Sequence, residues 1–290
     1  MPSIRNLARP LAVQFLLIAV VAGQVHGEPS VRNEEPEDAV GWTNLGIRHL
    51  TEGRFEDAVS ALLQSLELSP GQPRAEKVLG RCYVLMGRHA EAERAFARAL
   101  QIDPDDFEAP YLLGRLYQTV GRLQDAAVQF EKSLALRPEN PRPLAFLGSV
   151  YYGLGRVAEA QDKFSQAIAA NSRSPQPEYS PHLEFGIFLQ RTGDLDQSLK
   201  QLQKAAELGD HDLECHFELA RTLYRLGRLK EAKESLTTAM MRGAFDPRPY
   251  YLLGRICYEE GDRECGDHYT RRSEDLRRRS AEKGSADSGP

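Results

Sequence analysis

Two groups of cysteine and histidine residues are the parts of the chain whose side chains could hold a metal ion. The first group consists of His211, Asp212, Cys215 and His216. The second consists of Cys257, Cys265 and His268. Neither group has the paired spacing of a zinc site. We therefore expect no metal and no cofactor at either place.

Cys257 and Cys265 lie on either side of a turn predicted at Gly261, so they can meet if the two flanking segments are antiparallel. An oxidising compartment would allow them to pair. We expect a disulfide there, and a count of four free thiols in the non-reduced protein would exclude it. Cys82 and Cys215 are too far apart along the array described below to pair.

A period of 34 residues organises most of the chain, and residues 107–140 are its template. Gly114, Tyr117, Gly121 and Phe130 of this segment recur 34 residues earlier and 34 residues later. A fixed period of this length indicates a repeat array. We predict seven repeats, four over residues 39–174 and three over 179–280, separated by a four-residue insertion at 175–178.

Each repeat has the pattern of a helical hairpin. Apolar residues recur at helical spacing over residues 112–117, Gly121 is suited to ending that helix, and Pro138 is suited to stopping the second. Helices this short cannot bury their apolar faces alone, so neighbouring repeats must stack. The sequence thus predicts an all-α solenoid.

The two ends of the chain differ from the repeats. Residues 1–27 have a positive start, an apolar run and small residues at a plausible cleavage site, which predicts a signal peptide. Residues 28–38 are expected to form a flexible leader, and residues 281–290 a disordered tail. We therefore expect a periplasmic or secreted protein; the alternative is an anchor formed by the uncleaved N-terminal segment, although its apolar run is short for a membrane span.

The spacing within the repeats resembles that of the tetratricopeptide repeat family. Gly80-x2-Tyr83, Ala92-x3-Phe96 and Pro104 carry the resemblance most closely. It implies a right-handed superhelix in which the first helices line a concave groove for peptides or partner helices. The last repeat departs from the pattern, with Gly266 and Thr270 where Ala and Phe are expected. Its second helix should therefore pack loosely or act as a polar cap.

One face of the first helices carries basic and aromatic residues at repeat positions 5, 9 and 12. We expect the partner-binding groove to consist of Lys77, Arg81, Tyr111, Arg115, Tyr152, Phe217, Arg221, Tyr224, Tyr251, Arg255 and Tyr258. Guanidinium groups bind carboxylates in bidentate fashion, and Tyr adds rigid contact area. This composition indicates an acidic or carboxylate-bearing partner segment. A competing interpretation is that the Arg side chains are solvated or pair with acids of neighbouring repeats.

No phosphate-binding loop or nucleophile elbow is present in the sequence, and the segments outside the repeats are too short for a catalytic domain. Removing residues 1–27 takes away two Arg and no acid, so the net charge changes from -5 to -7, which disfavours general nucleic-acid binding. We predict a non-enzymatic protein–protein interaction scaffold without small-molecule substrate. Membrane contact is expected only through an uncleaved signal or a partner. The alternative function is a regulatory or assembly subunit of an envelope enzyme or secretion complex that docks by another surface.

Overall fold

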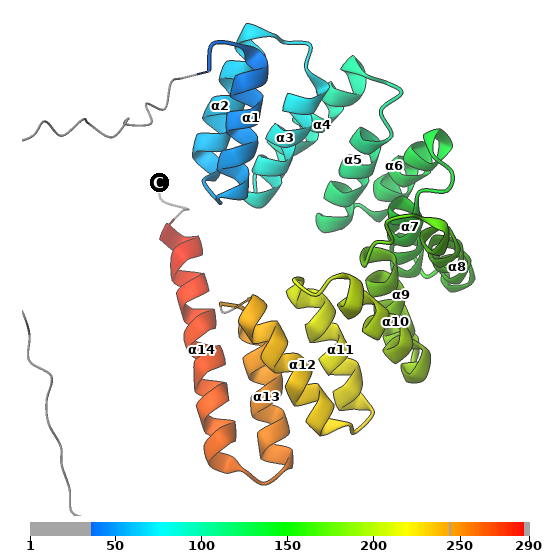
Figure 1. Ribbon diagram of the computed structural model, residues 1–290, viewed down its shortest axis with the longest axis vertical. Helices are drawn as coiled ribbons and strands as arrows, with labels where there is room; N and C mark the ends of the chain where they lie inside the picture. The colour runs from blue at the N-terminus through cyan, green and yellow to red at the C-terminus, as the bar shows by residue number, and fades with distance from the viewer. Residues whose placement is uncertain (1–35, 244, 287–290) are drawn as a thin grey trace, which may run out of the picture. The chain divides into compact units, whose positions relative to one another are not determined.

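The computed structural model describes residues 36–243 and 245–286, with side chains up to Arg279, and within these ranges it consists of fourteen helices (Figure 1). The predicted signal peptide and most of the predicted leader lie outside the described residues. The helices are α1 (Ala39–Thr51), α2 (Phe55–Leu68), α3 (Pro73–Leu85), α4 (His89–Ile102), α5 (Glu108–Thr119), α6 (Leu123–Leu136), α7 (Pro141–Gly153), α8 (Val157–Arg173), α9 (Ser180–Thr192), α10 (Leu195–Leu208), α11 (Leu213–Arg225), α12 (Leu229–Arg242), α13 (Pro247–Glu259) and α14 (Arg263–Ala286). Successive pairs form seven helical hairpins, which confirms the predicted solenoid.

A glycine in the left-handed region separates the two helices of every hairpin. Gly121, for example, has φ 78° between α5 and α6, and the equivalent glycine of each other repeat also has positive φ. Residues with a side chain rarely adopt this conformation, so the recurring glycine allows the chain to reverse within a few residues.

The core of each repeat forms where the two helices of the hairpin cross. Phe96, Phe130 and Phe164 occupy equivalent positions and are 0–1% exposed. Each packs against a glycine of the preceding helix, and a Cβ atom on Gly114 would lie 2.7 Å from a ring carbon of Phe130. The glycine therefore provides the space that the aromatic ring fills.

The last repeat solves the same packing problem with different residues. The ring of Tyr258 lies over Gly266, where a Cβ atom would be 2.4 Å from a ring carbon. Farther along α14, Ser273 and Leu276 are 1% and 2% exposed. Loose packing therefore does not describe this helix, because Tyr258 fills the space that a larger side chain at position 266 would have filled, and the alternative of a polar cap stays a prediction.

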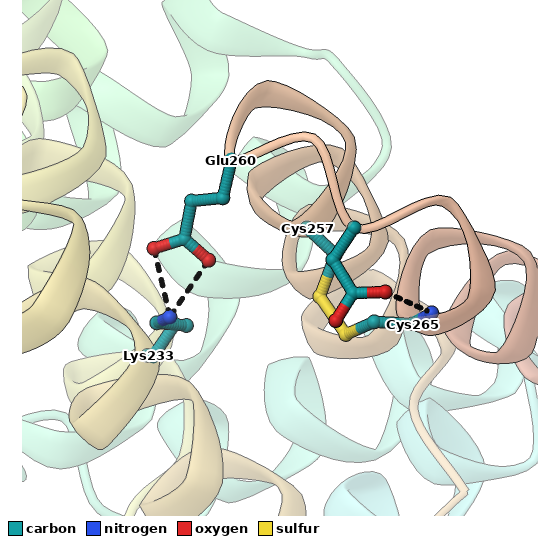
Figure 2. The surroundings of a disulfide bond; sticks show 5 residues. Lys233, Cys257, Glu260 and Cys265 are labelled. Atoms are coloured by element: carbon teal, nitrogen blue, oxygen red, sulfur yellow. Dashed lines mark hydrogen bonds and ion pairs between the residues drawn. A yellow bond between two sulfur atoms is a disulfide. The ribbon is translucent and has the colours of Figure 1, made fainter.

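A disulfide joins α13 to α14 in this repeat, between Cys257 and Cys265, whose Cα atoms are 5.7 Å apart (Figure 2). On the preceding repeat, Lys233 forms an ion pair of 2.8 Å with Glu260, which follows α13. Covalent and ionic links thus hold the last hairpin together and tie it to its neighbour.

Replacing Cys257 and Cys265 by Ser should lower the free energy of unfolding by about 2 kcal/mol, because the bridge closes a short loop in the unfolded chain. The midpoint of chemical unfolding, followed by circular dichroism, measures this loss. Thiol titration of the unfolded, non-reduced protein should find two thiols, from Cys82 and Cys215. Four thiols, or a variant that is as stable as the parent, would contradict the bridge.

The region between the fourth and fifth hairpins departs from the period. Helix α8 continues to Arg173, and the insertion at residues 175–178 leads into α9. At the other end, α14 continues to Ala286, so the predicted disordered tail does not describe residues 281–286, while 287–290 lie outside the described residues. No helix in the described part of the chain is long and apolar enough to cross a membrane.

Candidate partner-binding face

The odd-numbered helices, which begin each repeat, form one side of the array, here called the first-helix face. Each of these helices contacts the next odd-numbered helix, with the broadest contact between α7 and α9. Within the described residues, no even-numbered helix contacts the next even-numbered one. The residues predicted to line the groove all lie on odd-numbered helices, but the structure gives them different roles.

Arg81 and Arg115 are two basic residues of the predicted groove that form no ion pair with a described residue. Both are exposed. Burial raises the pKa of the nearby Glu184 carboxyl, and the Arg115 charge opposes that rise. The Arg115 guanidinium lies 4.2 Å from the centre of the Phe146 ring and donates a hydrogen bond of 3.2 Å to the Tyr111 hydroxyl. These contacts orient the Arg115 charge without cancelling it, so both guanidiniums can bind a carboxylate.

Lys77 does not offer a free charge on this face. Its ammonium group lies 2.7 Å from Asp106 and 2.6 Å from Glu108, at the start of the next repeat. Burial by itself would lower the Lys77 pKa, but the hydrogen bonds to the two carboxylates outweigh that effect and raise it. Lys77 therefore joins repeats 2 and 3, as the competing interpretation of the basic residues expected.

Arg221 is also committed to contacts inside the protein. Its Nη2 atom lies 2.8 Å from Oε2 of Glu218, and its Nε donates a hydrogen bond of 2.8 Å to Oε1 of Gln190. Glu218 is 3% exposed, and burial raises the pKa of its carboxyl to about 7 despite the nearby Arg221 charge. The Arg221 side chain therefore compensates a buried carboxyl group while it remains 36% exposed, and its predicted role in partner binding stays a prediction.

Arg255 contacts neighbouring side chains but stays accessible to a partner. Its Nη2 donates a hydrogen bond of 2.9 Å to the Tyr224 hydroxyl and lies 4.0 Å from Glu259. The Tyr224 hydroxyl in turn hydrogen-bonds to Glu259. The Arg255 side chain is 50% exposed, so its charge is only weakly neutralised and remains accessible.

The predicted aromatic residues divide between the surface and the core. Tyr251 is 44% exposed, and the Arg277 guanidinium lies 5.3 Å from its ring centre. Phe217, by contrast, is 7% exposed and belongs to the core. The Tyr258 hydroxyl donates a hydrogen bond of 2.6 Å to Asp267 of α14, so Tyr258 packs on its own repeat. Phe217 thus has little surface to offer a partner, whereas Tyr258 remains 43% exposed beside α14.

Tyr152 packs mainly against residues of the core. Its ring meets the Phe188 ring edge-on, with 5.3 Å between the ring centres. It is partly buried against the same hydrophobic cluster that contains Phe146. Tyr152 therefore helps to join α7 to α9 and offers only part of its surface to a partner.

A pocket of about 500 Å³ opens beside Tyr111 and Arg115. Arg142 and Phe146, which are not among the predicted groove residues, line this pocket from α7. Arg142 occupies the second position of its repeat, on the helical arc that contains the predicted groove positions, so this arc was the signal that could have identified it. The insertion lines the other side through Glu178.

The first group of residues considered for metal binding, at positions 211–216, does not form one site. The Cys215 side chain is buried, and burial raises its thiol pKa to about 12. His216 Nε2 lies 3.1 Å from the Asp210 carbonyl oxygen, whereas the His211 side chain is 87% exposed. No group of three or more metal-binding side chains occurs in the part of the chain that the structure describes.

Comparison with known proteins agrees with this architecture. Residues 49–116, 84–127 and 189–256 match one model of the tetratricopeptide repeat, and residues 111–175 match a second. The chain belongs to the tetratricopeptide repeat family. It is 34% identical to the Drosophila melanogaster "BBSome complex member BBS4 homolog" over 83 residues, which are 28% of this chain and 17% of that protein.

Two solved structures show the same fold. A chain in the Cut9–Hcn1 hetero-tetramer of the APC/C aligns with a TM-score of 0.65 and 20% identity, over 77% of this chain and 44% of that chain. Pseudomonas aeruginosa pilF aligns with a TM-score of 0.56 and 23% identity, over 68% of this chain and 88% of that chain. This chain therefore spans less than half the length of the first solved chain and a small part of the curated relative.

Tetratricopeptide repeats are protein–protein interaction modules, and their proteins bind protein or peptide partners. The arrangement described here matches such a role, because a rigid helical stack presents side chains at a regular spacing. The fold class therefore defines an interaction scaffold.

Proposed function

We propose that the protein is a non-catalytic scaffold that binds an acidic segment of a partner protein along the first-helix face. One observation carries this proposal: Arg81 and Arg115 lie at equivalent positions of adjacent repeats, and neither is paired with a carboxylate. A carboxylate that hydrogen-bonds to a guanidinium gains more than one that bonds to a neutral group. An extended segment with acidic residues can contact both.

Beside Arg81, the first-helix face also offers apolar contact. A pocket of about 610 Å³ is lined by Arg81 and by Ile47, Leu50, Val78 and Leu85. Leu85 is 58% exposed. The partner segment that fits this part of the face therefore combines an acidic residue with an apolar one.

We also propose that the protein works in an oxidising compartment, after export directed by residues 1–27. The disulfide between Cys257 and Cys265 supports this location, because such bonds persist outside the reducing cytosol. The other two cysteines, Cys82 and Cys215, are buried, and burial raises their thiol pKa values to about 11 and about 12. Thiols of this kind react slowly with oxidants and disulfides.

The second candidate function is that of an assembly subunit that docks through a different surface. Met241 and Phe245, at the end of α12 and in the turn after it, are 71% and 78% exposed. Large apolar side chains that are exposed at nearby sequence positions are candidates for a contact surface. This surface does not require the arginines of the first-helix face.

A capture experiment with residues 28–290 separates the two functions. Substituting Arg81 and Arg115 by Glu should remove the partner, because each lost charge-assisted hydrogen bond costs about 1.5–3 kcal/mol. We expect at least about a tenfold loss of captured partner for each substitution. Capture should also weaken with increasing salt.

The matched control substitutes Arg54 and Arg173 by Glu, two exposed arginines that form ion pairs with Glu52 and Glu139. This control makes the same change in net charge and should retain the partner. Circular dichroism should be used to check that both variants remain helical. Equal capture by the parent and the Arg81/Arg115 variant would exclude the first-helix face, and loss after Met241 and Phe245 are changed to Ser would support the subunit function.

A further inference from the structure

The insertion at residues 175–178 is fastened to the fourth repeat by a buried side chain. Asn171 is fully buried; its Nδ2 donates a hydrogen bond of 2.8 Å to the Glu178 carbonyl, and its Oδ1 accepts one of 2.9 Å from the Glu178 amide. Both polar groups of the amide side chain are thus used to hold one residue. The backbone of Glu178 therefore has a defined position at the edge of the 500 Å³ pocket.

Aromatic rings from two repeats form the apolar part of this pocket. The Tyr111 and Phe146 ring centres are 5.9 Å apart, and Phe146 stacks on Phe130 at 6.0 Å. The Arg115 guanidinium rests on the Phe146 ring, 4.2 Å from its centre. Packing on this side thus presents one unpaired guanidinium to the pocket in a fixed orientation.

A second guanidinium, from Arg142, is occupied by the insertion. Arg142 Nε donates a hydrogen bond to Oε2 of Glu178, 36 residues away in the sequence. Both side chains remain accessible, at 51% and 33% exposure. Arg115, Arg142 and Glu178 are the charged side chains among the lining residues, so the lining carries one net positive charge.

Glu178 places a carboxylate of the chain itself in this pocket. This carboxylate accepts a hydrogen bond from Arg142, one of the two arginines that line the pocket. The ion pair is partly exposed, and such pairs contribute little to stability, so an incoming carboxylate can replace Glu178 at low cost. The pinned backbone allows its side chain to rotate away without unfolding the insertion.

We propose that this pocket is a subsite for a carboxylate of the partner, and that Glu178 holds the position of that carboxylate on Arg142 until the partner binds. This inference rests on the proposed function, since it names the place on the first-helix face where one acidic residue is recognised. The aromatic walls favour a carboxylate that is adjacent to a planar or proline side chain.

Fluorescence anisotropy with two labelled decapeptides tests the subsite. The peptides share a backbone of Gly, Ser, Tyr and Pro; one carries four Glu residues, and the other carries Gln at the same places. We expect the parent to bind the Glu peptide and not the Gln peptide. Glu178→Gln should raise the affinity about tenfold by freeing Arg142, whereas Arg115→Gln should lower it about tenfold.

Glu139→Gln is the matched control, because Glu139 is also an exposed acid paired with an arginine, Arg173. Its affinity should stay within about twofold of the parent value, since neither Glu139 nor Arg173 lines the pocket. An equal gain from Glu139→Gln, or no gain from Glu178→Gln, would overturn the subsite.

Arg81→Glu separates this inference from the proposed function. If Arg81→Glu abolishes binding of the Glu peptide while Arg115→Gln and Glu178→Gln leave it unchanged, the first-helix face binds acidic segments but the pocket is not their subsite. If the parent binds neither peptide, or if all variants bind the Glu peptide equally, the proposed acidic specificity of the face fails together with the subsite.

Discussion

Replacing Phe130 by Ala is expected to lower the free energy of unfolding by about 3–5 kcal/mol. The Phe130 side chain is fully buried, fills the space left by Gly114 and stacks on Phe146 of the next repeat. Its removal leaves a cavity both within the third hairpin and at its contact with the fourth. The midpoint of urea unfolding, followed by circular dichroism, measures the loss.

Two other substitutions on α6 serve as controls for this result. Val128→Ala, at a side chain that is 47% exposed on the same helix, should change the free energy by less than about 0.5 kcal/mol. Phe130→Leu should cost less than Phe130→Ala, because Leu62, Leu202 and Leu236 fill the equivalent place in other repeats and are fully buried. Equal losses for all three variants would show that Phe130 is not a packing centre.

Glu218 should make the stability of the protein depend on pH. Burial raises the pKa of its carboxyl in the folded protein from 4.5 to about 7. The folded state therefore binds this proton more tightly than the unfolded state does. The stabilisation that this proton provides is complete below the unfolded pKa, near pH 4.5, and is lost as the pH rises through about 7.

We expect this carboxyl to reduce the free energy of unfolding by about 3 kcal/mol between pH 4.5 and pH 8. Arg221→Ala should increase the loss at pH 8, because ionised Glu218 would then be buried without its adjacent cation. Denaturant unfolding at a series of pH values, compared between the parent and Glu218→Gln, isolates this contribution.

The comparison needs a control, because the burial of Glu184 and of His182 shifts their pKa values as well. Glu139→Gln, at a carboxyl that is 77% exposed, should leave the pH dependence of the parent unchanged. Glu218→Gln should flatten the decline above pH 4.5. An identical pH dependence of the Glu218→Gln variant and the parent would show that this carboxyl does not titrate in the proposed range.

Which charges are available to a partner could not be predicted from the repeat pattern. Lys77 and Arg81 lie one helical turn apart, yet Lys77 is neutralised by Asp106 and Glu108 whereas Arg81 forms no ion pair within the described residues. Arg221 and Arg115 occupy equivalent positions, but Gln190, 31 residues before Arg221, accepts its hydrogen bond. Partners of this kind come from the neighbouring repeat, so periodicity alone does not identify them.

The sequence by itself determined the repeat period, the turn at each glycine and the recurrence of Gly114 and Phe130 at fixed positions. These features depend on contacts within one hairpin and recur in several repeats, so a regular pattern of residue types is enough to predict them. Only the tertiary structure decided that the Glu178 carboxylate accepts a hydrogen bond from Arg142, 36 residues away. It also decided that the Tyr258 ring fills the space beside Gly266. Side-chain contacts of this kind depend on how adjacent helices approach one another, and an insertion or a single substituted residue changes that approach without altering the period.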